Sequence, residues 1–170
     1  MYYLIAICLV VVDQLVKAWV RAAIPLGHSI PFIPYLMDLA YVRNTGAAFS
    51  VFASHTWLLT LVSLLGSALL AFLLWKNYFP GKLGKLALTL VLAGAVGNLI
   101  DRALLGSVTD MFETIFINFA VFNVADICVT VGGALLIFYV LFFWDKDRNS
   151  TENKGKDTDM DKAADEGDRT

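Results

Sequence analysis

Two aspartates, Asp110 and Asp126, lie sixteen residues apart in a largely apolar part of the chain, and neither has a Lys or His close in sequence. Two carboxylates in a partly desolvated site repel each other, so one proton is shared between them. The ionised carboxylate can then act as a general base on water, and the protonated one can act as a general acid. The pattern predicts an aspartic catalytic dyad. Capping of a helix by Asp126 is the alternative interpretation of that residue.

Asp13 and Lys17 are four residues apart inside an apolar block, so they share one face of a helix and can form an ion pair. An ionisable side chain in a membrane span costs about 2.5–3.5 kcal/mol at the bilayer centre, which makes such residues paired or functional. The pair either lies at the membrane interface near a helix end or reaches into a site at the outer boundary.

A third polar cluster, Asn98, Asp101 and Arg102, has the spacing i, i+3, i+4, which predicts that all three face the same way at a helix end. Gly94 and Gly97 precede it and permit close packing with a neighbouring helix. The cluster could belong to a site, or it could only join helices. Both interpretations stay open at this point.

Four apolar blocks must position these residues: 2–20, 57–75, 83–100 and 124–144. Each is close to the ~20 residues that a helix needs to cross a bilayer. Between the first two blocks, prolines and the turn-like sequence Asn44-Thr45-Gly46 surround short β-prone runs, which predicts a small sheet. The expected fold is an all-α membrane protein with four transmembrane helices and a small extracytoplasmic β-sheet.

The chain has 170 residues, of which 58% are hydrophobic and 16% charged, with a mean hydropathy of +0.68. Residues 145–170 contain nine acidic and six basic residues, a charge of −3, and residues 1–144 carry seven basic and six acidic ones, a charge of +1. We therefore expect one transmembrane domain over 1–144 and a polar, disordered cytoplasmic tail over 145–170. No basic stripe suited to nucleic acid is present in the sequence.

The basic residues also predict an orientation. Lys76, Lys82 and Lys85 lie in the short connection between the second and third blocks, and Lys146 and Arg148 follow the fourth. By the positive-inside rule these segments are cytoplasmic, so both termini are inside and the two aspartates lie near the outer face.

At this point the residues match a known family. The matching stretches are Asp13-Gln14-x-x-Lys17, Arg43-Asn44-Thr45-Gly46-Ala47-Ala48-Phe49, Gly97-Asn98-Leu99-Ile100-Asp101-Arg102, Val108-x-Asp110 and Phe122-Asn123-Val124-Ala125-Asp126. With these five stretches in order, the chain resembles bacterial lipoprotein signal peptidase, also called signal peptidase II, over about 1–144. The family commonly has Val-Val-Asp-Phe around its first catalytic acid, whereas this chain has Val108-Thr109-Asp110-Met111.

The resemblance implies a membrane aspartic endopeptidase that removes the signal peptide from diacylglyceryl-modified prolipoproteins, cutting before the lipidated cysteine. Asp110 and Asp126 match its catalytic pair. The positions that match its pocket or supporting residues are Asp13, Lys17, Asn44, Gly46, Asn98, Asp101, Arg102 and Asn123, with Asp101 as structural support. The expected partners are lipidated substrates and membrane lipids, for a monomer without cofactor or metal.

Two other functions compete with this one. A small proton-coupled transporter could use Asp13, Asp101, Asp110 and Asp126 as a relay, but such a relay should cross the midplane, and the second and fourth blocks have mostly apolar middles. A structural membrane scaffold would leave the two aspartates without a role.

Overall fold

The computed structural model describes residues 1–46 and 56–150. Its elements in chain order are α1 (Tyr2–Ala23), β1 (Ser29–Ile33), β2 (Met37–Asn44), α2 (Thr56–Trp75), α3 (Lys82–Leu105), β3 (Val108–Thr114) and α4 (Val124–Phe142). Ala47, Ala48 and Phe49 of the turn motif lie outside the described residues, as does the tail from 151 to 170.

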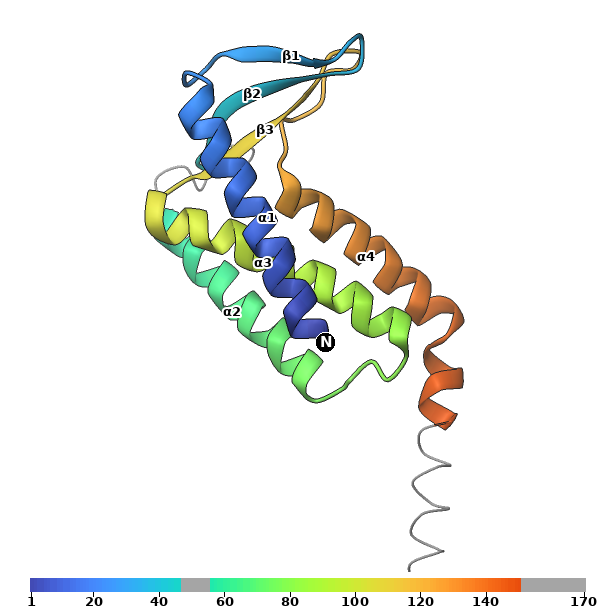
Figure 1. Cartoon of the computed structure of the whole chain (residues 1–170). Coiled ribbons are helices and arrows are strands. Elements are labelled where there is room, and N and C mark those ends of the chain that lie inside the picture. Colours follow the sequence, from blue (N-terminus) through green and yellow to red (C-terminus); the bar gives the residue numbers. More distant parts are fainter. Residues whose placement is uncertain (47–55, 151–170) are drawn as a thin grey trace, which may run out of the picture.

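Within the described residues, four helices are long and apolar enough to cross a membrane, which confirms the predicted fold class. α1 and α3 extend beyond the predicted blocks, to Ala23 and Leu105. These added turns carry both helices to the edge of the sheet (Figure 1). The chain therefore places the ends of its longest helices directly beside the β-strands.

α3 is the central helix and contacts each of the other three helices (Figure 1). Half of its membrane-length window is buried, against 11% for α2. α2 exposes large apolar side chains such as Leu64, Leu65 and Leu69. A helix that is apolar on its exposed face is suited to lipid as its solvent.

Close packing of α3 on α4 depends on small residues, as the sequence predicted for Gly94. A Cβ atom at Gly94 would meet the carbonyl oxygen of Ala125 and the side chain of Val129. Gly97 serves a different contact, because a Cβ there would lie 2.7 Å from a carboxylate oxygen of Asp13. These two glycines bring α4 and α1 against the same side of α3.

The predicted sheet is present and consists of three antiparallel strands in the order β1-β2-β3. It lies at the end of the bundle opposite the N terminus and the α2–α3 connection (Figure 1). β3 was not predicted from the sequence. An apolar cluster of Val20, Ile24, Leu39 and Met111 joins the end of α1 to β2 and β3.

The C-terminal boundary differs from the prediction. Residues 144–150 form a further helical segment instead of the start of a disordered tail. The fully buried Tyr139 side chain accepts a hydrogen bond from the Gly81 N–H at 3.1 Å, and its hydroxyl donates to Asp147 Oδ2 at 3.2 Å. Asp147 therefore connects this segment to α4 and to the α2–α3 connection, which charge composition alone does not show.

The contact of α3 with α4 can be tested with a pair of glycine variants. We expect Gly94→Ala to lower the free energy of unfolding by about 1–3 kcal/mol, because the new methyl group forces α3 away from the Ala125 carbonyl. Gly133→Ala on α4 is the matched control, since a Cβ there meets nothing within 4 Å. Thermal unfolding in detergent measures both, and equal effects would contradict the close-contact explanation.

Candidate active site

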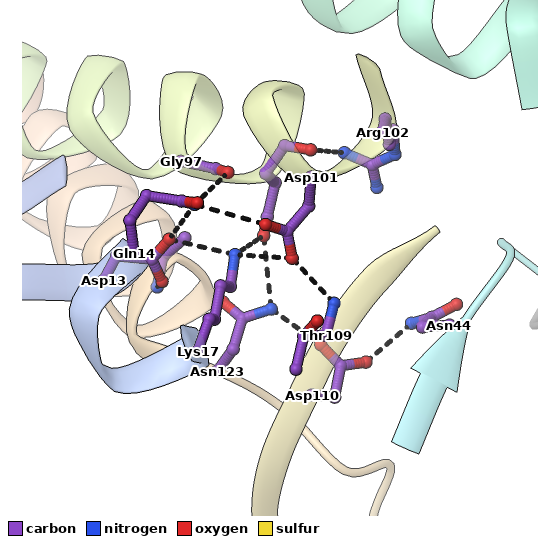
Figure 2. Close-up of polar contacts among 12 residues, drawn as sticks. Asp13, Gln14, Lys17, Asn44, Gly97, Asp101, Arg102, Thr109, Asp110 and Asn123 are labelled. Carbon is purple, nitrogen blue, oxygen red and sulfur yellow. Dashed lines mark hydrogen bonds and ion pairs between the residues drawn. The ribbon is translucent and has the colours of Figure 1, made fainter. Parts of the chain in front are cut away.

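The candidate site lies where the sheet meets the C-terminal ends of α1 and α3 and the N-terminal end of α4 (Figures 1 and 2). Of the ten predicted site residues, most converge here in one hydrogen-bonded network, and Asn44 joins it from the end of β2. Gly46 contacts Asn44 through its backbone N–H, and Arg102 turns toward α2. The contacts of each are described below.

Asp13 and Lys17 form the predicted ion pair, with Nζ 2.9 Å from Oδ2. They do not lie at an exposed interface, because Asp13 is 1% and Lys17 0% exposed. The Lys17 ammonium also donates to Asn98 Oδ1 at 2.9 Å and lies 3.5 Å from Asp101 Oδ2. Asp13 accepts from the backbone N–H of Ala125 at 2.9 Å through its other oxygen. The pair thus connects α1 to both α3 and α4.

Asp101 connects α3 to α1 and to the start of β3. Its carboxylate accepts from the Thr109 N–H at 2.8 Å and from Gln14 Nε2 at 3.3 Å (Figure 2). Arg21 Nη1 lies 3.8 Å from the same carboxylate and donates to Thr109 Oγ1 at 3.0 Å. These contacts fix the start of β3 on the ends of α1 and α3.

Arg102 does not face the same way as Asn98 and Asp101, contrary to the spacing argument. Its Nη1 lies 3.4 Å from Ser63 Oγ of α2 and 3.4 Å from the backbone oxygen of Asn98. Figure 2 shows it apart from the other labelled side chains. Neighbours at i+3 and i+4 differ in direction by a fraction of a turn, which is enough to send a long side chain to another helix.

The two amides of Asn98 and Asn123 lie between the aspartates. Asn98 Nδ2 donates to Asp126 Oδ1 at 2.8 Å, and Asn123 Nδ2 donates to Asp110 Oδ1 at 2.6 Å. Asn123 Nδ2 also donates to Asn98 Oδ1 at 3.2 Å. Each carboxylate therefore receives an amide N–H, and the two amides contact each other.

Asp126 is not the N-cap of α4. The cap is Asn123, whose side chain accepts from the Asp126 N–H at 2.9 Å, while Asp126 Oδ2 accepts from the Asn123 N–H at 3.1 Å. This reciprocal arrangement is a capping box. The capping and dyad interpretations of Asp126 are therefore compatible, because Oδ2 caps the helix and Oδ1 accepts from Asn98.

Asp110 lies on β3 and is only 2% exposed. Burial and, to a smaller extent, the nearby Asp126 charge raise its pKa to about 6, against the lowering effects of the hydrogen bonds from Asn44 and Asn123 and of the Lys17 charge. A carboxyl group with a pKa near neutrality can hold or release a proton at physiological pH.

Asn44 connects Asp110 to the surface. Its Nδ2 donates to Asp110 Oδ2 at 2.9 Å, and its Oδ1 accepts from the Gly46 N–H at 2.8 Å. Gly46 has a φ of +85°, a backbone conformation that favours glycine. Gly46 thus fixes the direction of the Asn44 amide and does not supply a side-chain contact.

A groove of about 460 Å³ opens beside the dyad. Its walls are residues 119–122 and the α4 residues Ile127, Thr130 and Val131, and its polar lining comes from Asn44 and Asp126. Asp126 is partly exposed, whereas Asp110 lies behind Asn44. An apolar groove with two polar groups at one end can orient an extended ligand against these carboxylates.

Three residues of the network were not among the predicted site residues: Gln14, Arg21 and Thr109. Gln14 was detectable, because a side-chain amide inside an apolar block is costly unless it finds partners. Its Nε2 donates to Gly97 O at 3.0 Å. Thr109 contributes mainly its backbone N–H, which leaves no signal in residue type.

Comparison with known proteins identifies the family. A family model described as Signal peptidase (SPase) II matches residues 5–142. The lipoprotein signal peptidase of Streptococcus agalactiae serotype Ia is 39% identical over 150 residues, which cover 88% of this chain and 96% of that protein. The lipoprotein signal peptidase of Lactococcus lactis subsp. lactis is 41% identical over 137 residues, which cover 78% and 87%.

Two solved structures, each described as a bacterial membrane enzyme, are similar in fold. One has a TM-score of 0.77 at 31% identity and covers 84% of this chain and 93% of its own. The other has a TM-score of 0.76 at 30% identity and covers 82% and 87%. With four membrane-length helices and relatives that match over most of their length, the chain belongs to the signal peptidase II family and is a multi-pass bacterial membrane peptidase.

Proposed function

We propose that the protein is an aspartic endopeptidase that removes the signal peptide from diacylglyceryl-modified prolipoproteins and cuts before the lipidated cysteine. Family membership supports the substrate class. The observation that carries the catalytic assignment is the Asn123 bridge: its side chain donates to Asp110 and its backbone to Asp126. One residue thereby contacts both carboxylates, of which Asp126 lines the apolar groove and Asp110 lies buried behind Asn44.

The two environments favour different roles for the two acids. Asp126 lines the groove and is held there by hydrogen bonds from Asn98 and from the Asn123 backbone, which positions it as the general base. Asp110 is buried with a pKa raised to about 6, which favours it as the proton donor. Asp126 would take a proton from a water molecule as the oxygen of that water attacks the scissile carbonyl carbon. Asp110 would protonate the departing amine as the C–N bond breaks.

The site lies at a depth that suits a lipid-anchored substrate. A peptide whose cysteine carries acyl chains presents its scissile bond near the membrane surface. The dyad lies where the membrane-length helices end and the sheet begins (Figure 1). The apolar walls of the groove would accept the apolar part of the signal peptide. One chain supplies both carboxylates and the groove, so we expect a monomer to be active.

The transporter alternative is not favoured by the arrangement of its proposed relay. Asp13, Asp101, Asp110 and Asp126 belong to one network at the sheet end of the bundle. A proton pathway would need acceptors along the other half of the helices as well.

Replacement of either dyad acid should abolish the reaction. We expect Asp110→Asn and Asp126→Asn to lower kcat for a diacylglyceryl prolipoprotein by about 10²- to 10⁴-fold, because each removes one proton-transfer group. Glu113→Gln, on the same strand as Asp110, is the matched control and should retain activity. Purified variants are assayed with and without a chelator. Wild-type turnover in either Asn variant would refute the dyad, and loss with chelator would indicate a metal hydrolase.

The pH dependence should follow the environment of Asp110. If protonated Asp110 is the acid, the basic limb of the kcat/KM profile reports loss of its proton. The Asn44 hydrogen bond stabilises the ionised form and so lowers this pKa. Asn44→Ala should therefore move the basic limb to higher pH by about one unit. An unchanged limb, or one at lower pH, would contradict the assignment of Asp110 as the acid.

The orientation in the membrane can be tested by labelling. In a Cys8→Ala/Cys128→Ala background, Asn77→Cys in the α2–α3 connection should resist an impermeant thiol reagent applied outside intact cells. His28→Cys beside the sheet should react readily. The lysines around residue 77 favour the cytoplasmic side. The reverse labelling pattern would place the dyad at the cytoplasmic face.

A further inference from the structure

We propose that Lys17 is a positioning residue that fixes the side-chain amide of Asn98 so that its NH₂ group faces Asp126. This inference rests on the proposed function, because it concerns the base of the dyad. Lys17 itself is 0% exposed, so it acts on the reaction only through other protein groups.

Each N–H donor of the Lys17 ammonium group has an acceptor. An ammonium group has three N–H donors and no acceptor. In this site its nitrogen lies 2.9 Å from Asp13 Oδ2, 2.9 Å from Asn98 Oδ1 and 3.5 Å from Asp101 Oδ2. Three acceptors from two helices therefore take the three donors, and the group that faces Lys17 on Asn98 must be an acceptor.

This requirement determines which way the Asn98 amide points. The oxygen and nitrogen of an amide are nearly the same size, so shape alone does not choose between the two orientations. In the flipped orientation the NH₂ of Asn98 would face the Lys17 ammonium, and its oxygen would face the carboxylate of Asp126. Both contacts would be repulsive. Asn123 Nδ2, which also donates to Asn98 Oδ1 at 3.2 Å, disfavours the flip as well.

The Asn123 amide is fixed by a different element. Its oxygen accepts the backbone N–H of Asp126 as part of the capping box, and its Nδ2 points to Asp110. The cap of α4 thus orients the amide that serves Asp110. A buried cation on α1 orients the amide that serves Asp126. This division explains why a lysine is present at a depth where an ionisable group is costly.

Other charges surround this chain of contacts. Asp13 and Asp101 face Lys17, and Arg21 lies 3.8 Å from the second oxygen of Asp101. Asp110 lies near enough to Asp126 for their charges to interact, and Arg102 interacts electrostatically with both acids. Of the two basic residues on α1 in this network, Lys17 contacts Asn98, whereas Arg21 contacts Asp101 and Thr109. Lys82, which is exposed at the opposite end of α3, provides a control for loss of positive charge.

A structural role alone would also explain the presence of a lysine in this cluster. Lys17 would then only neutralise the carboxylates of Asp13 and Asp101. The two roles differ in what a charge-balanced double variant does. Asp13→Asn/Lys17→Met removes one cation and one anion, so it relieves unpaired charge without restoring the donor to Asn98 Oδ1.

The test measures kinetics and pH profiles of purified full-length variants. We expect Lys17→Met to lower kcat about 10- to 100-fold with little change in KM, and to move the acid limb of the profile up by about one pH unit. The reason is that without Lys17 the Asn98 oxygen keeps only the weaker contact from Asn123, so the amide donates less reliably to the base. The charge-balanced variant should show the same defect, and Lys82→Met should stay close to wild type. In an Asn98→Ala background, Lys17→Met should cost no more than about threefold further.

Several results would overturn the inference. Recovery of wild-type kcat in the charge-balanced variant, an unmoved acid limb, or a full additional loss in the Asn98→Ala background would each assign Lys17 a structural role alone. If Lys17→Met does not fold, the charge-balanced variant and the Asn98→Ala background carry the same comparison. These outcomes leave the dyad intact. Only activity in Asp110→Asn or Asp126→Asn would remove the proposed function itself.

Discussion

The ion cluster of Lys17, Asp13 and Asp101 is the interaction on which the rest of the site depends. Its members come from α1 and α3, and through backbone N–H groups they also hold Ala125 at the start of α4 and Thr109 on β3. Removing charges from water is unfavourable unless geometry and extra hydrogen bonds compensate. Here the cost is offset because each charged group has several partners, at least one of them in another element. The same contacts that make the charges tolerable therefore set the relative positions of three helices and the sheet.

Asp110 and Asp126 have different environments because they belong to different kinds of backbone. Asp126 lies in the first turn of α4, where the N–H groups and the helix dipole favour negative charge. Asp110 lies on a strand with both faces covered, where burial favours the neutral acid. Asn123 touches both, since it caps the helix and donates to the strand acid. Helix capping and contacts to both carboxylates thus come from a single residue, through its side chain and its backbone N–H.

Much of this architecture follows from the sequence, and the exceptions have physical causes. Long apolar blocks predicted all four of these helices. Asp13, Lys17 and Asn98 were predicted as site residues because they are polar residues inside such blocks. β3 was missed because Val108–Met111 is buried continuously, without the alternation that marks a strand with one exposed face. The direction of Arg102 depends on Ser63, thirty-nine residues away. Residues 145–150 were assigned to a disordered tail because the contact between Asp147 and Tyr139 cannot be inferred from composition.

The spacing of Asp13 and Lys17 also bears on how the protein is made. α1 leaves the ribosome before α3 and α4 exist, so at that stage Asp101, Asn98 and the Ala125 N–H are absent. The two charges are already one helical turn apart, and they can neutralise each other within α1. Each ionisable group would otherwise add a few kcal/mol to the cost of inserting the helix. An intrahelical pair lets the first span enter the bilayer early, and later helices then recruit its ammonium for the assembled site.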